Sequence, residues 1–343
     1  MTERTERSEG REGVPGWYGM TERTERSEGR EGVPGEYGMT DPAVAVEARE
    51  VGRRYGGVWA LRECSFRLPA GRIVALVGAN GAGKSTLMSI IAGTLAATCG
   101  SLLVHGRPVA RGRSGGGGAA GSRVAILAQD KPLYRDFSVA DMLRFGRSTN
   151  RAWDQRRALS WLDRFDIPLD RRCGRLSGGQ RAQVALAVAL GSRPAVLLLD
   201  EPLANLDPVA RTEVTGELMA EAADGDMTVM LSTHIIAELS GVGDHLLLLD
   251  AGRAVLTGDV DELLGSHVRL TGPRADQPPG PGVIVQARHT DRQSTFVLRQ
   301  PAAPATHAVV APGWAAQPLT LDELILTYLR ASATESRSLE AVS

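Results

Sequence analysis

The chain has 343 residues, of which 43% are hydrophobic and 23% are charged, and its formal net charge is −1. These values are typical of a globular protein and give no bulk attraction for nucleic acid or anionic lipid. No apolar run approaches the roughly 20 residues of a membrane-spanning helix. Because the first residues are polar and charged, we expect no ordinary secretory signal. Three cysteines without metal-ligand spacing indicate reduced thiols.

The first 38 residues are a tandem repeat, because residues 1–19 recur as 20–38 with Trp17 replaced by Glu36. The repeat is polar and charged and offers almost no apolar surface to bury, so we expect a disordered tail. A partner-binding role for this tail is the less favoured alternative. The duplication places a methionine at Met39, where the globular sequence starts and where translation could begin.

Residues 39–265 alternate short apolar runs with amphipathic stretches. The apolar runs predict buried strands at 72–77, 124–127, 195–199, 228–231 and 245–249. Apolar spacing and flanking residues predict helices at 85–95, 138–147, 156–165 and 181–190. Strands separated by helices indicate a parallel α/β sheet. The glycine-rich stretch 112–121 is expected to form a surface loop.

The composition changes after Gly265. Residues 272–282 are rich in proline and glycine and indicate a linker or loop. Short strands are then expected at 283–287, 294–298 and 307–310, followed by an amphipathic helix at 321–330. We therefore predict a small second domain over 266–331 and a flexible tail over 332–343.

Residues 78–85 (GANGAGKS) match the pattern G-x-x-x-x-G-K-[ST], directly between a predicted strand and a predicted helix. Glycines let backbone N–H groups wrap closely around a triphosphate, and the helix N-terminus adds a favourable dipole. Lys84 places a compact charge on the phosphates, and Ser85 offers a hydroxyl to Mg²⁺. The predicted ATP-binding residues of this loop are Gly78, Ala79, Asn80, Gly81, Ala82, Gly83, Lys84, Ser85 and Thr86.

An apolar strand ending in two carboxylates lies at 196–201 (VLLLDE). An open α/β sheet carries its ligand chemistry at the carboxyl ends of its strands. Asp200 is suited to hold Mg²⁺, and Glu201 is suited to polarise an attacking water. Alone, this pattern is equally compatible with a strand-end cap, whereas together with residues 78–85 it favours phosphate chemistry.

A second helix start of the anion-binding type lies at 176–180 (LSGGQ), where Ser177 can cap the helix. With this segment the sequence resembles the ABC ATPase family, whose signature is LSGGQ. In that family the signature of one subunit closes over the nucleotide held by another. The resemblance covers residues 43–264 and predicts a site acting in trans that consists of Leu176, Ser177, Gly178, Gly179 and Gln180.

Further residues match the family's motifs in the family's order. Tyr55 matches the aromatic residue that stacks on adenine, and Gln129 matches the glutamine that senses Mg²⁺ and water. Asp207, in Asn205-Leu-Asp207, matches the loop that links the two nucleotide sites. His234 matches the histidine that contacts the γ-phosphate.

The resemblance implies a P-loop NTPase core of the α/β class. It implies a mostly parallel sheet, an antiparallel β subdomain, an α-helical signature subdomain at about 130–190, and a small α+β C-terminal domain. The implied activity is ATP hydrolysis, with ATP and Mg²⁺ as cofactors. The implied catalytic residues are Glu201, His234 and Gln129, and the implied metal-binding residues are Ser85, Gln129 and Asp200.

The resemblance also implies partners: integral membrane permease subunits and a second ATPase subunit, most simply in a homodimer. The expected location is cytoplasmic, at the inner face of the cell membrane, and no nucleic-acid partner is expected. The C-terminal region that ends in 321–330 looks similar to the tails of bacterial exporter ATPases of the ABC-2 kind. Export is therefore the predicted direction.

Two alternatives to transport stay open. One is a soluble ABC ATPase that acts on ribosomes or DNA. It is disfavoured because the ribosome-associated class has two ATPase units per chain, and because the interval from Lys84 to Leu176 lacks the heptads or cysteine pairs of the DNA-acting class. The other is a non-catalytic nucleotide sensor, which the presence of Glu201 and His234 disfavours.

Overall fold

The computed structural model describes residues 44–109, 124–130, 133–202, 208–223, 227–233, 243–300 and 311–340. All of these residues belong to one unit that begins at Thr40. Several predictions concern residues outside these ranges. They are the repeat tail, the glycine-rich loop 112–121, the strand 307–310 and the roles of Asn205, Asp207 and His234. None of the helices in the described ranges is long and apolar enough to cross a membrane.

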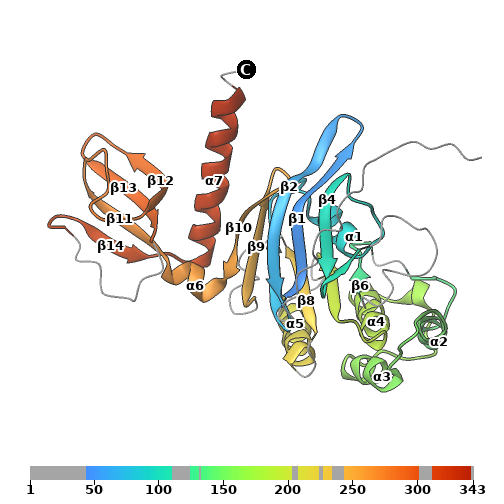
Figure 1. The fold of residues 1–343 in the computed structure, drawn as a ribbon. Coiled ribbons are helices and arrows are strands. Elements are labelled where there is room, and N and C mark those ends of the chain that lie inside the picture. Colours follow the sequence, from blue (N-terminus) through green and yellow to red (C-terminus); the bar gives the residue numbers. More distant parts are fainter. Residues whose placement is uncertain are drawn as a thin grey trace, which may run out of the picture. The chain divides into compact units, whose positions relative to one another are not determined.

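A six-stranded sheet in the order β10-β9-β3-β8-β7-β6 forms the centre of the fold (Figure 1). Its parallel strands are β3 (Ile73–Val77), β6 (Val124–Leu127), β7 (Val196–Asp200), β8 (Thr228–Thr233) and β9 (His245–Asp250). The remaining strand, β10 (Arg253–Asp259), pairs antiparallel with β9. Every residue of β3, β7 and β8 is buried, as expected for parallel strands covered on both faces. The predicted parallel α/β sheet is confirmed.

A second, antiparallel sheet has the order β2-β1-β4-β5. It consists of β1 (Val44–Tyr55), β2 (Val58–Pro69), β4 (Cys99–Val104) and β5 (Arg107–Pro108). Its buried face shares a core with the central sheet and with α1 (Lys84–Ile91), through residues such as Leu68, Leu76 and Leu87. Helix α1 ends earlier than predicted because Gly93, with a φ of 72°, turns the chain out of the helix.

The helical part of the fold contains α2 (Val139–Thr149), α3 (Gln155–Arg164) and α4 (Gly178–Gly191), which contact one another. Helix α2 begins with a capping box, in which Ser138 and Asp141 each satisfy the other's backbone N–H. Trp161 of α3 is fully buried and donates from Nε1 to Oε1 of Gln183 on α4 over 2.9 Å. This bond satisfies two buried polar atoms, Trp161 Nε1 and Gln183 Oε1.

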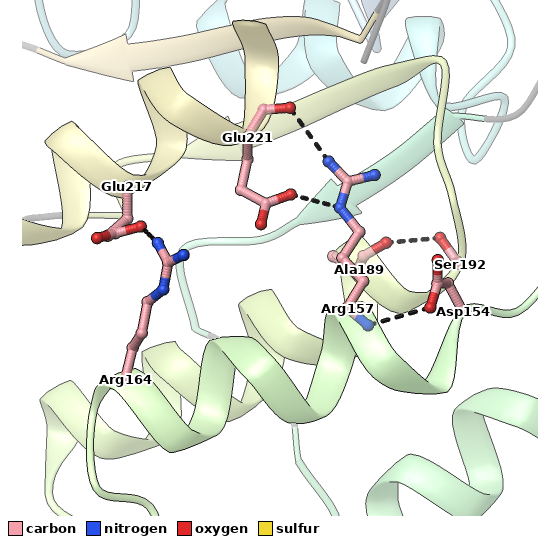
Figure 2. Close-up of polar contacts among 7 residues, drawn as sticks. All are labelled: Asp154, Arg157, Arg164, Ala189, Ser192, Glu217 and Glu221. Atoms are coloured by element: carbon pink, nitrogen blue, oxygen red, sulfur yellow. Dashed lines mark hydrogen bonds and ion pairs between the residues drawn. The ribbon is translucent and has the colours of Figure 1, made fainter. Parts of the chain in front are cut away.

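Two ion pairs attach α3 to α5 (Pro208–Ala223), as Figure 2 shows. Arg157 donates from Nε to Oε2 of Glu221 over 2.5 Å and from Nη2 to the backbone carbonyl of Glu221 over 3.2 Å. Two turns further along α3, Arg164 pairs with Glu217. Since the Arg157 and Glu221 side chains are each only 21% exposed, this pair is partly shielded from water.

The start of α3 is also bonded to the end of α4. Asp154 caps α3 by accepting from the backbone N–H of Arg157 over 3.0 Å, and its own N–H donates to the carbonyl of Gly191 over 2.7 Å (Figure 2 shows the capping bond). Helix α3 therefore connects α4 on one side with α5 on the other.

Beyond α6 (Val260–Gly265), an antiparallel sheet in the order β12-β13-β11-β14 packs with α7 (Leu321–Glu340). Its strands are β11 (His267–Pro273), β12 (Val283–His289), β13 (Gln293–Arg299) and β14 (Ala315–Pro318). This composition confirms the predicted α+β character of the C-terminal region, while the domain boundary at 265 stays a prediction. Helix α7 continues ten residues past its predicted end at Arg330.

We expect Arg157→Ala to lower the free energy of unfolding by about 1–2 kcal/mol, because Glu221 then stays partly buried without its cation. Urea unfolding followed by circular dichroism measures the change. Arg62→Ala is the matched control, since Arg62 and its partner Glu63 are 55% and 56% exposed and such surface pairs contribute little. Equal losses in the two variants would contradict the role assigned to Arg157.

Candidate functional site

The carboxyl ends of β3, β8, β7 and β6 lie next to one another at one edge of the central sheet, because these strands are parallel neighbours. Strand β3 leads into residues 78–85, and β7 ends at Asp200. Strand β6 leads to Gln129, and β8 ends one residue after Ser232. The pairing order therefore collects the predicted chemistry from distant parts of the sequence at a single place, as an open α/β sheet does.

The loop 78–85 closes around the Lys84 side chain. Lys84 is 7% exposed, and its Nζ donates to the carbonyls of Gly78 over 2.7 Å and Ala79 over 3.1 Å. Burial lowers the pKa of the Lys84 ammonium, and the Glu201 and Asp200 carboxylates oppose this shift. The lysine therefore faces both the loop backbone and the two acids at the end of β7.

Glycines allow this loop to pass close to other backbone segments. Gly83 has a φ of 104°, and a Cβ at this position would lie 2.6 Å from the carbonyl oxygen of Ala60. Gly81 has a φ of 83°. Both backbone conformations lie in the left-handed region, which residues other than glycine rarely adopt. By contrast, Ala79, Asn80 and Ser85 are exposed on the loop and at the start of α1.

The two acids differ in environment. Asp200 is 7% exposed and accepts at Oδ1 from the Ser232 hydroxyl over 2.7 Å. Glu201 is partly exposed, has a φ of 46°, and accepts at Oε2 from Nε2 of Gln129 over 3.1 Å. The structure thus brings Gln129 and Glu201 into direct contact although 72 residues separate them in the sequence.

Ser232 is a site residue that the sequence reasoning missed. Its hydroxyl bonds Asp200, and the backbone N–H of Glu201 donates to its Oγ over 2.9 Å. The signal in the sequence was a serine that follows the apolar residues 229–231 of a predicted strand. The structure shows that every residue of this strand, β8, is buried. Only the pairing of β8 with β7 reveals which groups it contacts.

The residues 176–180 form the start of α4 rather than a loop before it. Ser177 is the N-cap: its Oγ accepts from the backbone N–H of Gln180, and the Gln180 side chain accepts from the N–H of Ser177, each over 3.2 Å. The helix therefore begins at Gly178, three residues before its predicted start. The N–H groups of Gly178 and Gly179 stand in the first turn, where no helical carbonyl can accept from them.

Tyr55 lies at the end of β1 and is 47% exposed. The Arg53 guanidinium lies 4.6 Å from its ring centroid, in a cation–π arrangement. The stacking role of Tyr55 stays a prediction. The predicted roles of Asp207 and His234 concern residues outside the described part of the chain.

The oxygen groups at the sheet edge fit Mg²⁺. Ser85, Gln129 and Asp200 offer a hydroxyl, an amide oxygen and one carboxylate, which are the hard donors that Mg²⁺ prefers. Within the described ranges there is no group of three or more His, Cys, Asp and Glu residues that could hold a metal on its own. A donor set with a single carboxylate is suited to a cation that shares its coordination with phosphates and water.

We expect Gly83→Ala to weaken ATP binding at least tenfold and to lower the free energy of unfolding by about 2 kcal/mol, because the new Cβ strains the backbone and meets Ala60. Fluorescence titration with a labelled ATP analogue and urea unfolding test this. Gly216→Ala is the control: Gly216 lies in α5 with open space around it, so alanine should stabilise by about 0.5–1 kcal/mol and leave ATP binding unchanged. Wild-type ATP affinity in Gly83→Ala would contradict the loop's role.

Comparison with known proteins gives a consistent result. A family model described as ABC transporter matches residues 61–204. The aliphatic sulfonates import ATP-binding protein SsuB of Cupriavidus necator is 35% identical over 213 residues, which cover 62% of this chain and 68% of that protein. The Nod factor export ATP-binding protein I of Rhizobium etli is 31% identical over 255 residues, which cover 68% and 79%. The match to the molybdenum import ATP-binding protein ModC of Mycobacterium tuberculosis is 34% identical over 223 residues, 62% of this chain, but spans only 59% of that protein's length.

Solved structures share the fold. An ATP-binding subunit of an ABC transporter is 25% identical, with a TM-score of 0.57 over 64% of this chain and 91% of that one. The cbiO1 protein of Clostridium perfringens, part of an ABC transporter complex, is 28% identical, with a TM-score of 0.56 over 65% and 91%. Together with the loop 78–85, Asp200 and Glu201 at the end of β7, and the LSGGQ start of α4, these relatives show that the chain belongs to the ABC transporter family as an ATP-binding, ATP-hydrolysing subunit.

Proposed function

We propose that the chain is the ATP-driven motor of a membrane exporter and acts on separately encoded permease subunits at the inner, cytoplasmic face of the cell membrane. The observation that carries the motor role is the meeting of Lys84, Asp200, Glu201 and Gln129 at one edge of the sheet. A phosphate-binding loop, a metal-binding acid and a water-orienting acid are the parts that phosphoryl transfer to water requires.

In this proposal ATP binds along residues 78–86, and Tyr55 stacks on the adenine. Lys84 exchanges the carbonyls of Gly78 and Ala79 for the β- and γ-phosphates, which are stronger acceptors. Ser85, Gln129 and Asp200 would hold Mg²⁺, which would neutralise phosphate charge.

The attack of water on the γ-phosphate depends on residues that follow the carboxyl ends of β7, β6 and β8. Glu201 accepts a hydrogen bond from the water that attacks the γ-phosphate, and Gln129 fixes the Glu201 carboxylate. His234 contacts the γ-phosphate.

The second half of the site comes from another subunit. In the described ranges Ser177 and Gln180 bond each other, and no hydrogen bond joins 176–180 to 78–86. The N–H groups of Gly178 and Gly179 at the start of α4 are suited to a phosphate. We therefore propose a homodimer with two composite sites, in which Leu176–Gln180 of one chain closes over ATP on the other and Asp207 links the sites. A solved structure with this fold is dimeric and holds ADP and phosphate; it has 20% identity and a TM-score of 0.54, and covers 62% of this chain and 98% of that one.

Two observations support export. The match to the Nod factor exporter subunit of R. etli covers 79% of that protein, whereas the match to ModC covers 59% of the importer subunit. Among the described residues, the region after Gly265 contains one four-stranded sheet and α7. This small size is similar to that of the C-terminal tails of ABC-2 exporter ATPases. The match to the sulfonate importer subunit covers 68% of that protein, a value between these two.

Glu201→Gln is expected to reduce ATP turnover to background while the chain retains ATP as a dimer, because the amide cannot accept the proton of the attacking water. Turnover assays and size-exclusion chromatography with labelled ATP measure the two effects. Glu213→Gln, on an exposed position of α5, is the control and should behave as wild type. Wild-type turnover in Glu201→Gln would contradict the assignment.

The ATP-retaining Glu201→Gln chain also tests the transport role. Used as bait in detergent-solubilised membranes, it should recover a polytopic membrane protein. Recovery of ribosomes or DNA in its place would contradict transport.

A further inference from the structure

The Ser232 hydroxyl lies between the two acids that the proposed mechanism uses. We propose that Ser232 is a positioning residue for ATP hydrolysis, which fixes the Asp200 carboxylate and the Glu201 backbone through one hydroxyl group. This inference rests on the proposed function of the site and adds a residue to it.

The strand pairing places Ser232 with little freedom. It lies on β8, in register with Asp200 on β7 and with Leu76 on β3, and it is 1% exposed. Neighbouring strands therefore hold its backbone on both sides, and burial shields its hydroxyl from bulk solvent. A side chain as short as serine then has its oxygen at a defined position relative to both acids.

The direction of the hydroxyl proton follows from its partners. The N–H of Glu201 can only donate, so Ser232 Oγ is the acceptor of that bond over 2.9 Å. The single hydroxyl proton is then donated to Oδ1 of Asp200 over 2.7 Å. This relay from N–H to hydroxyl to carboxylate polarises each bond and fixes which Asp200 oxygen is engaged.

The bond to Glu201 also holds an uncommon backbone conformation. Glu201 has a φ of 46°, in the left-handed region that residues other than glycine adopt infrequently. Ser232 holds the backbone N–H of Glu201, and Gln129 holds the carboxylate at the other end of the same residue. Hydrogen bonds therefore hold Glu201 at both ends, at its backbone N–H and at its carboxylate.

A purely structural hydroxyl on the same strand provides the comparison. Thr228 is also 1% exposed, and its Oγ1 accepts from the backbone N–H of Gly71 over 3.0 Å. This bond joins two backbone segments at the opposite end of β8 and touches neither acid. If Ser232 were only a satisfied core residue, removing its hydroxyl would resemble removing that of Thr228.

The experiment compares Ser232→Ala with Thr228→Val, each in the wild-type chain and in the non-hydrolysing Glu201→Gln chain. In the Glu201→Gln chain, the dissociation constant of a fluorescent ATP analogue is measured with Mg²⁺ and with EDTA. We expect Ser232→Ala to reduce the gain in affinity that Mg²⁺ provides about tenfold, as for loss of a hydrogen bond to a charged group, with the affinity in EDTA unchanged. Thr228→Val should change neither value.

In the wild-type chain, we expect Ser232→Ala to lower turnover about ten- to a hundredfold at saturating ATP and Mg²⁺. Ser232→Thr keeps the hydroxyl and should have most of the wild-type turnover rate. Thr228→Val should have the wild-type turnover rate. A wild-type Mg²⁺ gain and turnover in Ser232→Ala would overturn the proposal, as would an equal loss in Thr228→Val.

If Ser232→Ala does not fold, the decision passes to Ser232→Cys, whose thiol is a weak donor of similar size. The proposal is supported if Ser232→Cys reduces the gain in affinity that Mg²⁺ provides more than Ser232→Thr does. Equal reductions in the two variants overturn it. Absence of hydrolysis in the unmodified chain would count against the proposed function, whereas hydrolysis that Ser232→Ala leaves unchanged counts against Ser232 alone.

Discussion

The parallel pairing of β8 with β3 on one side and β7 on the other is the constraint on which the site depends. It places the loop that contains Lys84 on one side of the buried strand β8, and Asp200 and Glu201 at the end of β7 on the other side. The Ser232 hydroxyl can then reach both Asp200 and the backbone of Glu201. Strand β6 extends the same edge and delivers Gln129 to Glu201. The chemistry is thus a consequence of strand order, since none of these contacts exists between neighbours in the sequence.

The helical part adds the LSGGQ helix start to this frame. Helix α3 is bonded to the end of α4 through Asp154. It is bonded to α5 through Arg157 and Arg164, as Figure 2 shows. Helix α5 is the next helix in the sequence after β7, so these bonds connect α4, which begins with the LSGGQ segment, to the helix that follows β7. In the proposed dimer, a movement of α4 toward nucleotide on another chain would therefore displace α3 and, through α3, also α5. In the proposed dimer, each chain would supply residues 176–180 to the nucleotide site of its partner.

Sequence patterns predicted those features that depend on local order. The continuous apolar runs of β3 and β7 indicated buried strands, and the loop 78–85 was evident from its glycines and Lys84. The start of α4 was placed three residues late, because two glycines have low helix propensity while the capping box that overrides it involves Ser177 and Gln180. Strands β1 and β2 were not located, since bulges interrupt their alternation. Ser232 and the α3–α5 ion pairs were missed because their partners lie 31 to 64 residues away and only the folded chain brings them together.

The central claim is that each working site is shared between two chains, and mixing two inactive variants tests it most directly. Lys84→Ala disables the phosphate loop, and Gly179→Asp places a negative charge in the first turn of α4, where it suits the helix dipole but repels phosphate. In an equal mixture, half of the dimers contain one variant of each kind, and each such dimer has one intact composite site. ATP turnover in the mixture should therefore recover to about a quarter of the wild-type rate. Turnover that stays at the background of the separate variants would contradict a site shared in trans.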